Sequence, residues 1–323
     1  MKLLILKSTD PYLNLAIEEY LFKYTEDDIF MLWQNEPTVV IGKNQNAYVE
    51  INREYTEPNN IHIARRITGG GAVYHDLGNV NYTFISSRQK KEIDFEYFTK
   101  PIITALHTLG VNAELSGRND ITVDGKKISG NAQHSTDTRT LHHGTLLFDS
   151  DLSVLSSALN VDIEKMKSKA ISSTRSRVTN IRSLLKEDYT TSQFIEALKR
   201  QIIVFYNPQL IVAPKNQAIN ELYIRNKSDE WIYPKNSYVS KYEEIKKGRF
   251  DFGGIEAHIE LQNETVIALR VFGDFFGNKP ISEIEVALQN TLKKDIKKKL
   301  STIDVSEYIS GMTNEAFIDF IIK

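Results

Sequence analysis

Three consecutive glycines, Gly69 to Gly71, separate two short β-like runs at 62–65 and 72–74, and they impose the strongest local constraint on the fold. Glycine lacks a Cβ atom, so this backbone can turn tightly and approach a bulky anion with its N–H groups directed inward. Arg65 and Arg66 precede the glycines and can donate charged, bidentate hydrogen bonds to phosphate or carboxylate. The alternative is a tight turn with two surface arginines, and these residues alone leave both interpretations open.

The residues around the glycines exclude two common phosphate-binding loops. A P-loop ends in Gly-Lys-Ser/Thr, which is absent here, and a dinucleotide fingerprint has a different glycine spacing and opens a crossover helix. A different phosphate cradle is therefore implied. The chain has 40 Lys and Arg against 42 Asp and Glu, so no overall positive field attracts nucleic acid, and local groups must hold any anionic ligand.

Short β-like runs and helical patterns alternate along the chain, which favours an α/β (α+β) fold with a mixed sheet. Asp10 and Pro11 are a favourable helix start, because the carboxylate can cap the first N–H groups and proline fits the first turn. Helices are expected at 11–24, 101–109 and 192–205. The expected β-like runs lie at 2–7, 29–33, 39–41, 62–65, 72–74, 81–86, 113–116, 121–123, 127–129 and 140–148.

A chain of 323 residues exceeds the usual size of one domain, so we predict a large domain at 1–243 and a small accessory domain at 244–323. Residues 226–248 combine polar residues with isolated aromatics and are predicted to form a linker with partial packing. Alternating apolar residues within 255–271 predict a hairpin, and a helical pattern at 284–292 follows it. The accessory domain should therefore be a small α/β unit.

A second polar cluster lies at 117–132. Asp124 and Gly125 suit a tight hairpin turn, so Lys127 is expected early in the return strand, at a place fixed by a rigid sheet. A cation placed there can neutralise anionic oxygens. Lys126 should face the opposite side, because neighbours on a strand alternate. An isolated lysine is more commonly a solvated surface residue, and that alternative stays open for Lys127 at this point.

The chain contains no cysteine, which excludes disulfides, thiolate metal sites and a cysteine nucleophile. His142 and His143 are neighbours on an expected strand and would face opposite sides, so the histidines do not indicate a metal site. The apolar run Leu3 to Leu6 is too short for a signal sequence, and no segment approaches the ~20 apolar residues of a membrane span. We therefore expect a cytoplasmic protein without membrane association.

Several stretches carry a more specific pattern: 65–76, then 117–120 with 127–132, and 142–147. Together they resemble the signatures of the lipoate–protein ligase A family, and the resemblance spans nearly the whole chain. The stretch 273–277 is similar to a segment in the small domain of bacterial members, although its residues alone favour simple packing of that domain. The resemblance implies a large mixed-sheet catalytic domain of the biotin/lipoate ligase type and a small α/β C-terminal domain.

The resemblance implies a two-step reaction that uses ATP and Mg²⁺. Lipoate attacks the α-phosphate of ATP to give lipoyl-adenylate and pyrophosphate, and an acceptor lysine then attacks the adenylate carbonyl. The implied acceptors are lipoyl domains of oxo-acid dehydrogenase complexes and the H protein of glycine cleavage, each offering a lysine on an exposed hairpin. No covalent enzyme intermediate is needed, which suits a chain without cysteine, and we expect a monomer.

The resemblance also implies roles for individual residues. Lys127 would contact the lipoate carboxyl and the phosphate, and its charge would oppose the repulsion between two anions. Asp120 would orient Lys127 or hold Mg²⁺, and a loop at 165–177 would close over the adenylate and exclude water. The other residues implied to bind substrate or ATP are Arg65, Arg66, Gly69, Gly70, Gly71, Ala72, Val73, Tyr74, Asn79, His143 and Thr145.

Related chemistries make different demands on the sequence. An octanoyl or lipoyl transferase that works through a thioester needs a cysteine, and a biotin ligase needs a Gly-Arg-Gly-Arg type loop; the chain has neither. Two alternatives stay open at this point. One is a transferase that uses preformed lipoyl-adenylate but activates lipoate weakly, and the other is a non-catalytic protein that binds an acyl-adenylate or a lipoyl domain.

Overall fold

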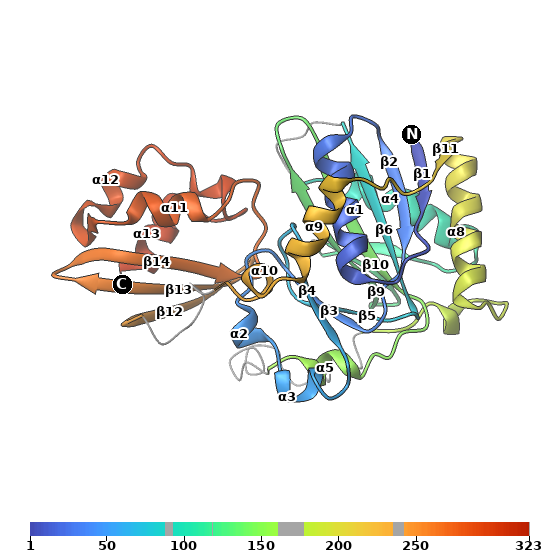
Figure 1. The fold of residues 1–323 in the computed structure, drawn as a ribbon, viewed down its shortest axis with the longest axis horizontal. Coiled ribbons are helices and arrows are strands. Elements are labelled where there is room, and N and C mark those ends of the chain that lie inside the picture. The colour runs from blue at the N-terminus through green and yellow to red at the C-terminus, as the bar shows by residue number, and fades with distance from the viewer. Residues whose placement is uncertain (88–92, 118, 161–177, 235–241, 323) are drawn as a thin grey trace. The chain divides into compact units, whose positions relative to one another are not determined.

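The computed structural model describes residues 1–87, 93–117, 119–160, 178–234 and 242–322. Arg118 and the predicted loop at 165–177 therefore lie outside the described residues. The chain forms two compact units (Figure 1). The large unit comprises Met1–Val40, Ile51–Ala64 and Val73–Ser228, and the small unit comprises Ile41–Glu50, Arg65–Ala72 and Asp229–Lys323. The domain boundary between 243 and 244 stays a prediction.

The large unit is built on an eight-stranded mixed sheet, as predicted. Strand β1 pairs in parallel with both of its neighbours, and the pairs from β2 to β7 are antiparallel. In sheet order the strands are β11 (Gln209–Ile211), β1 (Lys2–Ile5), β2 (Ile29–Trp33), β6 (Asn79–Ser86), β10 (Thr140–Leu147), β9 (Lys126–Ser135), β8 (Asp120–Val123) and β7 (Glu114–Ser116). A second sheet has the order β4 (His62–Arg65), β3 (Thr38–Ile41) and β5 (Val73–His75).

Helices cover both faces of the large sheet. Helix α4 (Phe95–Thr108) packs against α8 (Thr191–Tyr206), and α1 (Pro11–Tyr24) packs against α9 (Gln217–Lys227). Tyr82 of β6 lies in the core with α4 and α8, whereas its neighbour Thr83 hydrogen-bonds to Glu18 of α1. Because successive strand residues face opposite sides, α1 and α4 lie on opposite faces. Short helices are α2 (Ala47–Glu50), α3 (Arg53–Thr56) and α5 (Val154–Ala158).

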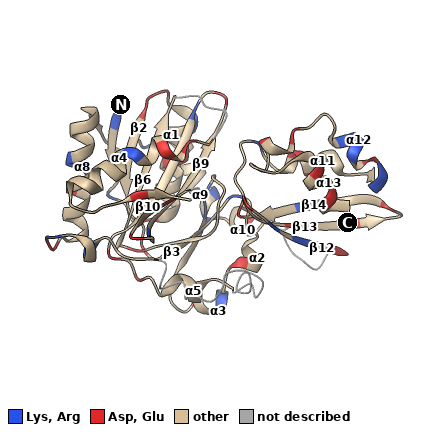
Figure 2. Ribbon diagram, turned by 180° about the vertical axis from the view of Figure 1, so that it is seen from behind, with Lys and Arg blue, Asp and Glu red and all other residues tan. Residues whose placement is uncertain are grey.

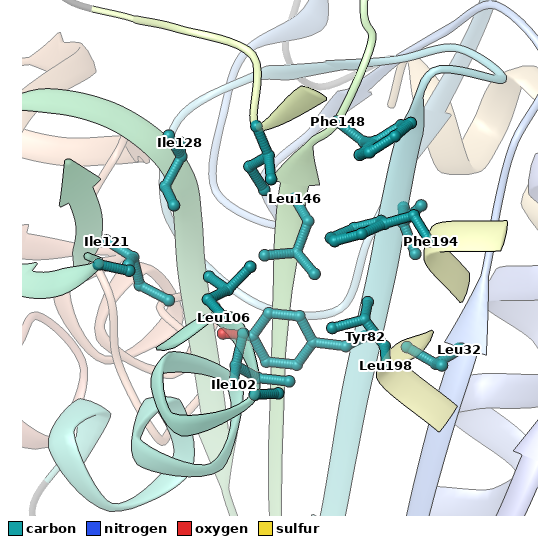
Figure 3. Close-up of a cluster of buried hydrophobic side chains, with 14 of the residues drawn as sticks. Leu32, Tyr82, Ile102, Leu106, Ile121, Ile128, Leu146, Phe148, Phe194 and Leu198 are labelled. Carbon is teal, nitrogen blue, oxygen red and sulfur yellow. The ribbon is translucent and has the colours of Figure 1, made fainter. Parts of the chain in front are cut away.

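The main core lies between the sheet and helices α4 and α8 (Figure 3). Phe148, which follows β10, stacks on Phe194 of α8 with ring centroids 4.4 Å apart. Tyr82 is fully buried in the same cluster. The other labelled side chains in this core are Leu32, Ile102, Leu106, Ile121, Ile128, Leu146 and Leu198. Burial of these apolar side chains holds the sheet in place. Polar residues project from the opposite face of that sheet.

The predicted start of α1 is confirmed, but α4 begins earlier than expected. Asp10 accepts hydrogen bonds from the first turn of α1, with Pro11 as the first helical residue. Helix α4 begins at Phe95 rather than at Pro101, because the Asp94 carboxylate caps the helix. Pro101 is tolerated inside α4 although it removes one N–H donor. After the helix, Gly110 has a φ of 83°, a left-handed conformation that favours glycine and suits the end of a helix.

His142 is a buried residue of this core with no hydrogen-bond partner for either ring nitrogen among the described residues. Its ring stacks on Phe98 of α4, with centroids 5.1 Å apart. Burial, reinforced by the neighbouring His143, holds the pKa of His142 well below its ordinary value. In the folded protein the ring is therefore neutral, while the unfolded chain takes up a proton near pH 6.5.

We therefore predict that acid destabilises the protein partly through His142. The unfolded state binds the proton and the folded state does not, so the free energy of unfolding should fall below about pH 6.5 by up to ~1.4 kcal/mol per pH unit from this group. His142→Phe should remove that part of the change in unfolding free energy between pH 7 and pH 5.5, with the free energy measured by urea unfolding at each pH. The control Phe98→Leu should lower stability equally at both values. An unchanged slope in His142→Phe would contradict the assignment.

The small unit contains a four-stranded antiparallel sheet with helices packed against its apolar face. The predicted hairpin is confirmed, and its turn residues Asn263 and Glu264 have φ of 49° and 61°. The strands are β12 (Glu244–Phe250), β13 (Gly253–Gln262), β14 (Thr265–Gly273) and β15 (Thr291–Leu292), and the helices are α10 (Asp229–Ile232), α11 (Ser282–Leu288), α12 (Ile296–Leu300) and α13 (Asn314–Ile322).

Two expectations for this part of the chain were wrong. The interval 226–248, taken as a linker, contains helix α10 and the start of β12. The helix expected at 284–292 ends at Leu288, and Leu292 belongs to β15, because Asn290 adopts a positive φ of 58° that ends the helical run. Acidic and basic residues are interspersed over both units, with lysines gathered on α12 (Figure 2). Within the described residues, no helix is both long and apolar enough to cross a membrane.

Candidate functional site

Lys127 lies on the hairpin formed by β8 and β9, as expected. Asp124 and Gly125 form its turn with φ of 49° and 73°, the left-handed conformations that a tight hairpin requires. Lys126 is exposed and Lys127 is half-buried, which agrees with their predicted opposite orientations. Close to the turn the register shifts between Ile121 and Thr122 of β8, which pair with Ser129 and Lys127 of β9, and such an irregularity redirects a side chain on the opposing strand.

The Lys127 side chain is held by Asp120 and lies across Gly130. Lys127 Nζ lies 2.7 Å from Asp120 Oδ1, and both side chains are 35% exposed. A Cβ atom at Gly130 would lie 2.9 Å from Lys127 Nζ and 3.0 Å from its Cε. The absence of a side chain at Gly130 therefore leaves the space that the ammonium group occupies. At this exposure the ion pair contributes little stability, so its main effect is to set the position of the charge.

We predict that Gly130→Ala displaces the Lys127 ammonium while leaving the fold intact. The added methyl group meets only the flexible end of a lysine, so stability should change by less than ~0.5 kcal/mol. The charge, however, must leave its position beside Asp120, and adenylate formation should fall about tenfold. Pyrophosphate release and the urea midpoint measure the two quantities. Asp120→Asn, which weakens the same pair, is the companion variant, and a full rate in Gly130→Ala would contradict the proposed geometry.

Residues of the neighbouring strands hold the backbone around Lys127. The Thr145 hydroxyl accepts a hydrogen bond of 3.2 Å from Gly130 N, so this predicted site residue lies beside the lysine hairpin. The Asn131 side chain donates to Asn119 O at 3.0 Å, and Asn119 donates back to Asn131 O at 2.7 Å. The buried Tyr82 hydroxyl donates to Asn131 Oδ1. This arrangement fixes the residue that precedes Asp120.

The backbone of Lys127 also anchors the chain that follows the undescribed segment. Thr179 N donates to Lys127 O at 3.0 Å, and Val178 forms a parallel bridge with Lys127. The first described residues after 161–177 therefore run along the lysine hairpin. The role expected for 165–177 stays a prediction.

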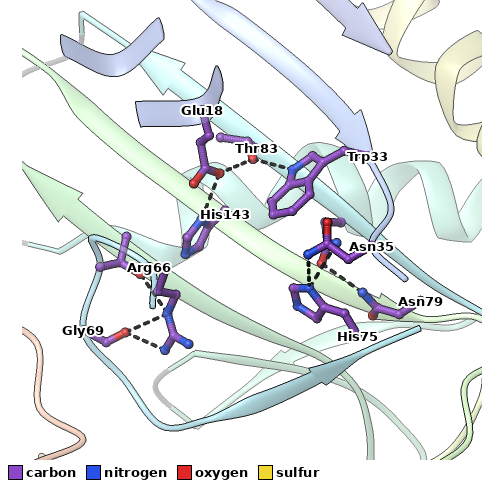
Figure 4. A network of polar contacts seen from close by, with 11 residues as sticks. Glu18, Trp33, Asn35, Arg66, Gly69, His75, Asn79, Thr83 and His143 are labelled. Carbon is purple, nitrogen blue, oxygen red and sulfur yellow. Dashed lines mark hydrogen bonds and ion pairs between the residues drawn. The ribbon is translucent and has the colours of Figure 1, made fainter. Parts of the chain in front are cut away.

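His143 belongs to a buried polar network on the face of the sheet covered by α1 (Figure 4). Its Nδ1 lies 2.9 Å from Glu18 Oε1, and the same oxygen accepts a hydrogen bond of 2.6 Å from the Thr83 hydroxyl. Trp33 Nε1 in turn donates to that hydroxyl at 2.9 Å. Glu18 is only 1% exposed, and a carboxylate buried this deeply needs such donors. The network fixes the orientation of the His143 ring.

Asn79 belongs to a second network, next to β5 (Figure 4). Its side chain donates to Asn81 Oδ1 at 2.9 Å, and Asn35 Nδ2 lies 3.0 Å from His75 Nδ1. Asn79 is fully buried, and its Oδ1 has no hydrogen-bond partner among the described residues. His75 also meets Trp33 edge to face, with centroids 6.0 Å apart. Trp33 thus links the surroundings of His75 and of His143.

The side chain of Arg66 hydrogen-bonds to the backbone of Gly69 to Gly71, called the glycine segment below. Arg66 Nη2 donates to Gly69 O at 2.7 Å and to Gly71 O at 2.8 Å, and its Nε donates to the Thr68 hydroxyl at 3.0 Å. Gly70 has a φ of 91°, which favours glycine. The Arg66 side chain is buried, and its described contacts hold the loop. A role for Arg66 near a ligand carboxylate or phosphate stays a prediction.

Arg65 is likewise buried, among backbone carbonyls of the small unit. Its guanidinium donates to carbonyl oxygens of 42–45 and of 231–232. Burial lowers the pKa of Arg65 to about 10, so the group stays charged at neutral pH. The sequence predicted a ligand contact, whereas these contacts tie two segments of the chain together. Contact with ATP or lipoate stays a prediction for Arg65.

Val73 and Tyr74 follow the glycine segment on β5 and pair with Val40 and Val39 of β3. Burial, with a smaller effect of Asp76, raises the pKa of Tyr74 to about 12, so its hydroxyl stays protonated at neutral pH. Ala72 is half-buried. Val73 and Tyr74 are placed by strand pairing, as the β-like pattern predicted, whereas Ala72 precedes β5 and His75 completes it.

The structure thus forms two groups of predicted site residues. Lys127, Asp120 and Thr145 are brought together in the large unit, and Arg66 is brought together with Gly69 to Gly71 in the small unit. Convergence of the two groups on one ligand stays a prediction. Among the described residues, no three His, Asp or Glu side chains are placed to share a metal ion.

Sequence reasoning missed Glu18, Thr83 and Trp33. The available signal was Glu18 itself, an acidic residue beside the apolar Ile17 and Leu21 on the buried side of α1. A charge at such a position needs a buried partner. The identity of the partner could not be read, because Thr83 and His143 lie far away in the sequence.

The chain is similar to known proteins along nearly its whole length. A family model described as the lipoyl protein ligase A/B catalytic domain matches residues 10–203, and one described as the bacterial lipoate protein ligase C-terminus matches residues 240–321. The lipoate–protein ligase LplJ of Bacillus subtilis is 42% identical over 323 residues, covering 97% of each chain.

Solved structures show the same likeness. The P. falciparum LipL1 structure in complex with lipoate has a TM-score of 0.81 and 26% identity, and the match covers 100% of this chain and 98% of that one. A lipoate–protein ligase A structure bound with ATP has a TM-score of 0.61 and 28% identity, over 72% of this chain and 98% of that one. With both family models matched and a curated relative similar over its whole length, the chain belongs to the lipoate–protein ligase family.

Proposed function

We propose that this chain attaches lipoate to a lysine of an acceptor protein in two steps. A carboxylate oxygen of lipoate attacks the α-phosphorus of ATP, and the bond from that phosphorus to the bridging oxygen breaks, giving lipoyl-adenylate and pyrophosphate. The neutral amine of the acceptor lysine then attacks the carbonyl carbon. The new amide forms as the bond to AMP breaks, and the amine loses a proton to water.

The observation that carries this proposal is the Lys127 ammonium, held by Asp120 across Gly130 on a stiff hairpin. Two anions, a carboxylate and a phosphate, must approach each other in the first step. A fixed cation between them offsets their repulsion and stabilises the charge that develops during attack. In the second step the same ammonium stabilises negative charge on the carbonyl oxygen. Its position is set before substrate binds, so no reorganisation is needed at the moment of reaction.

We assign the remaining predicted residues to binding. The N–H groups of Gly69, Gly71 and Ala72 would donate to the phosphates, with Arg66 and the bond from Gly70 N to Phe275 O shaping the segment, and Val73 and Tyr74 would contact the nucleotide. His143, Thr145 and Asn79 would border the adenosine and acyl groups. The likeness to a ligase solved with ATP and to one solved with lipoate supports this assignment.

Mg²⁺ is the expected companion of ATP, and Asp120 was the predicted ligand. Asp120 Oδ1 pairs with Lys127, and the described residues form no cluster of three metal-ligating side chains. These residues do not fit a protein-made Mg²⁺ site. We therefore propose that Mg²⁺ arrives with ATP and is held mainly by phosphate oxygens and water, as is common for this ion.

The proposed acceptors are lipoyl domains of oxo-acid dehydrogenase complexes and the glycine cleavage H protein. The family resemblance supports both, and a lysine on an exposed hairpin is the feature they share. We further propose that the chain acts as a monomer, which light scattering tests, and that it works in the cytoplasm, where ATP is available.

A direct test incubates the purified chain with ATP, Mg²⁺, lipoate and several candidate acceptor domains, and reads the mass that each acceptor gains. The expected result is one added lipoyl group on one lysine, dependent on ATP. A parallel reaction with synthetic lipoyl-adenylate separates the alternatives: modification only in that arm indicates a transferase with weak activation. Binding of lipoyl-adenylate without transfer in either arm would contradict the proposed function.

A further inference from the structure

The motif at 273–277 has no role in the function proposed above. Its residues nevertheless lie very close to Gly69 and Gly70 within the small unit. It forms the end of β14 and the turn that follows. Phe275 and Phe276 are both buried there. Phe275 belongs to the apolar core of the small unit, whereas Phe276 is not part of that cluster. The position of the Phe276 ring therefore has another explanation.

The Phe276 ring lies against the glycine segment. A Cβ atom at Gly70 would lie 3.2 Å from two atoms of this ring, closer than ordinary contact. A Cβ atom at Gly69 would overlap the carbonyl oxygen of Phe275 and lie 3.0 Å from Phe276 Cα. Gly70 N and Asn44 Nδ2 each lie 3.4 Å from that same oxygen. The 273–277 turn thus requires glycine at position 69, and at position 70 it adds to the constraint from the positive φ and from Arg66 Nη2, which would lie 2.9 Å from a Cβ atom.

The chain after β3 also packs against the glycine segment. A Cβ atom at Gly42 would overlap the carbonyl oxygen of Gly70. The carbonyl oxygen of Asn44 accepts a hydrogen bond of 2.9 Å from Gly273 N, at the first residue of the 273–277 motif. The glycine segment is therefore packed between 42–44 and the 273–277 turn.

The turn itself is fixed to the body of the small unit. Ser310 N donates to Phe276 O at 2.8 Å, and a Cβ atom at Gly277 would overlap the carbonyl oxygen of Tyr308. Asp274 Oδ1 accepts from Gly254 N at 2.5 Å. These bonds leave the turn little freedom to move away from Gly69 and Gly70. It can therefore act as a rigid support for a segment that has no side chains of its own.

We infer that the 273–277 turn positions the glycine segment for ATP, with Phe276 as the positioning residue. This inference rests on the proposed function of the segment as the phosphate cradle. N–H groups bind phosphate well only when their directions are fixed before binding, and a run of glycines is intrinsically the most mobile backbone. The close contacts of Phe275 and Phe276 remove that mobility. The small unit thereby contributes to adenylate formation without contributing a group that reacts.

The test compares Phe276→Ala and Phe276→Leu with Phe317→Leu in the full-length chain. Phe317 is a buried phenylalanine of the same unit, in its apolar core, and serves as the matched control. Three quantities are measured: the Kd for ATP, the KM for ATP in pyrophosphate release, and the rate of transfer from synthetic lipoyl-adenylate to an acceptor. The urea midpoint of each variant reports folding. Partial unfolding would raise the apparent Kd and KM by the inverse of the folded fraction, so all measurements are made without urea on variants whose urea midpoint shows them to be essentially fully folded.

We expect Phe276→Ala to raise the Kd and KM for ATP about tenfold, Phe276→Leu to raise them less, and Phe317→Leu to leave both unchanged. Transfer from preformed lipoyl-adenylate should stay within about twofold of the wild-type rate. Wild-type Kd and KM in both Phe276 variants, or an equal rise in Phe317→Leu, would overturn the inference. If Phe276→Ala does not fold, the Kd and KM of Phe276→Leu decide whether the inference holds. A wild-type chain that binds ATP without turnover would refute the proposed function, while the Kd comparison would still decide the role of Phe276.

Discussion

Replacing Lys127 with alanine is expected to lower the rate of lipoyl-adenylate formation by about 10³-fold while the protein stays folded. The half-exposed side chain supplies charge to the site and little to the core, and its ion pair with Asp120 adds little stability. Without the ammonium group, the carboxylate of lipoate must approach the α-phosphate with no cation between them. Pyrophosphate release with ATP and lipoate measures the loss.

Lys126→Ala is the matched control for this experiment. Lys126 is the adjacent residue of the same strand, has the same charge and is exposed. Lys126→Ala and Lys127→Ala each remove one positive charge from the hairpin. An effect of net charge alone would therefore appear in both variants. We expect a near wild-type rate from Lys126→Ala. Wild-type rates from a folded Lys127→Ala protein would refute the role assigned to Lys127.

Replacing Arg65 with methionine should have the largest effect on stability, about 3–5 kcal/mol of the free energy of unfolding. The Arg65 guanidinium donates to the carbonyls of Gly42, Lys43, Gln45, Trp231 and Ile232 at 2.6 to 3.1 Å. Methionine fills a similar space but removes all five of these hydrogen bonds together with the charge, and the loss of hydrogen bonds to buried acceptors is costly. Urea unfolding measures the change.

Two further variants make the Arg65 result specific. Arg65→Lys restores the charge but not the planar set of donors, so it should recover only part of the lost stability. Arg182→Met removes an exposed arginine that pairs with Asp149 and Asp188, and it should leave the urea midpoint nearly unchanged. If Arg65→Met instead unfolds at the wild-type midpoint and loses only ATP binding, Arg65 contacts the nucleotide and the structural role is wrong.

Features with a strong local signal could be predicted from the sequence. Asp124-Gly125 specifies a tight turn through backbone conformation alone, so the position of Lys127 on the return strand followed. Asp10 with Pro11 marked the start of α1 for a similarly local reason. The start of α4 was missed because Pro101 resembles a helix start, whereas the cap at Asp94 and the burial of Phe95 decide it.

Contacts between distant segments could not be predicted. The types of Arg65 and Arg66 indicated strong donors, but whether they face a ligand or the backbone depends on the fold of 42–45 and 231–232 around them. The partners of Glu18 lie on β6 and β10 for the same reason. The alternation of β12 was masked by its polar residues, because one face of this edge strand is exposed.

The hydrogen bonds of Arg66 have a consequence for how a buried arginine can serve an anion that it does not touch. The carbonyl oxygens of Gly69 and Gly71 point at the guanidinium. In a trans peptide the N–H of the next residue points the opposite way, so the Gly70 N–H, which donates to Phe275 O, and the Ala72 N–H both face away from Arg66. The cation polarises both peptide units along that direction. Along the Gly69–Gly70 peptide this strengthens the bond to Phe275 O, and along the Gly71–Ala72 peptide it leaves positive potential at the Ala72 N–H without any mobile side chain.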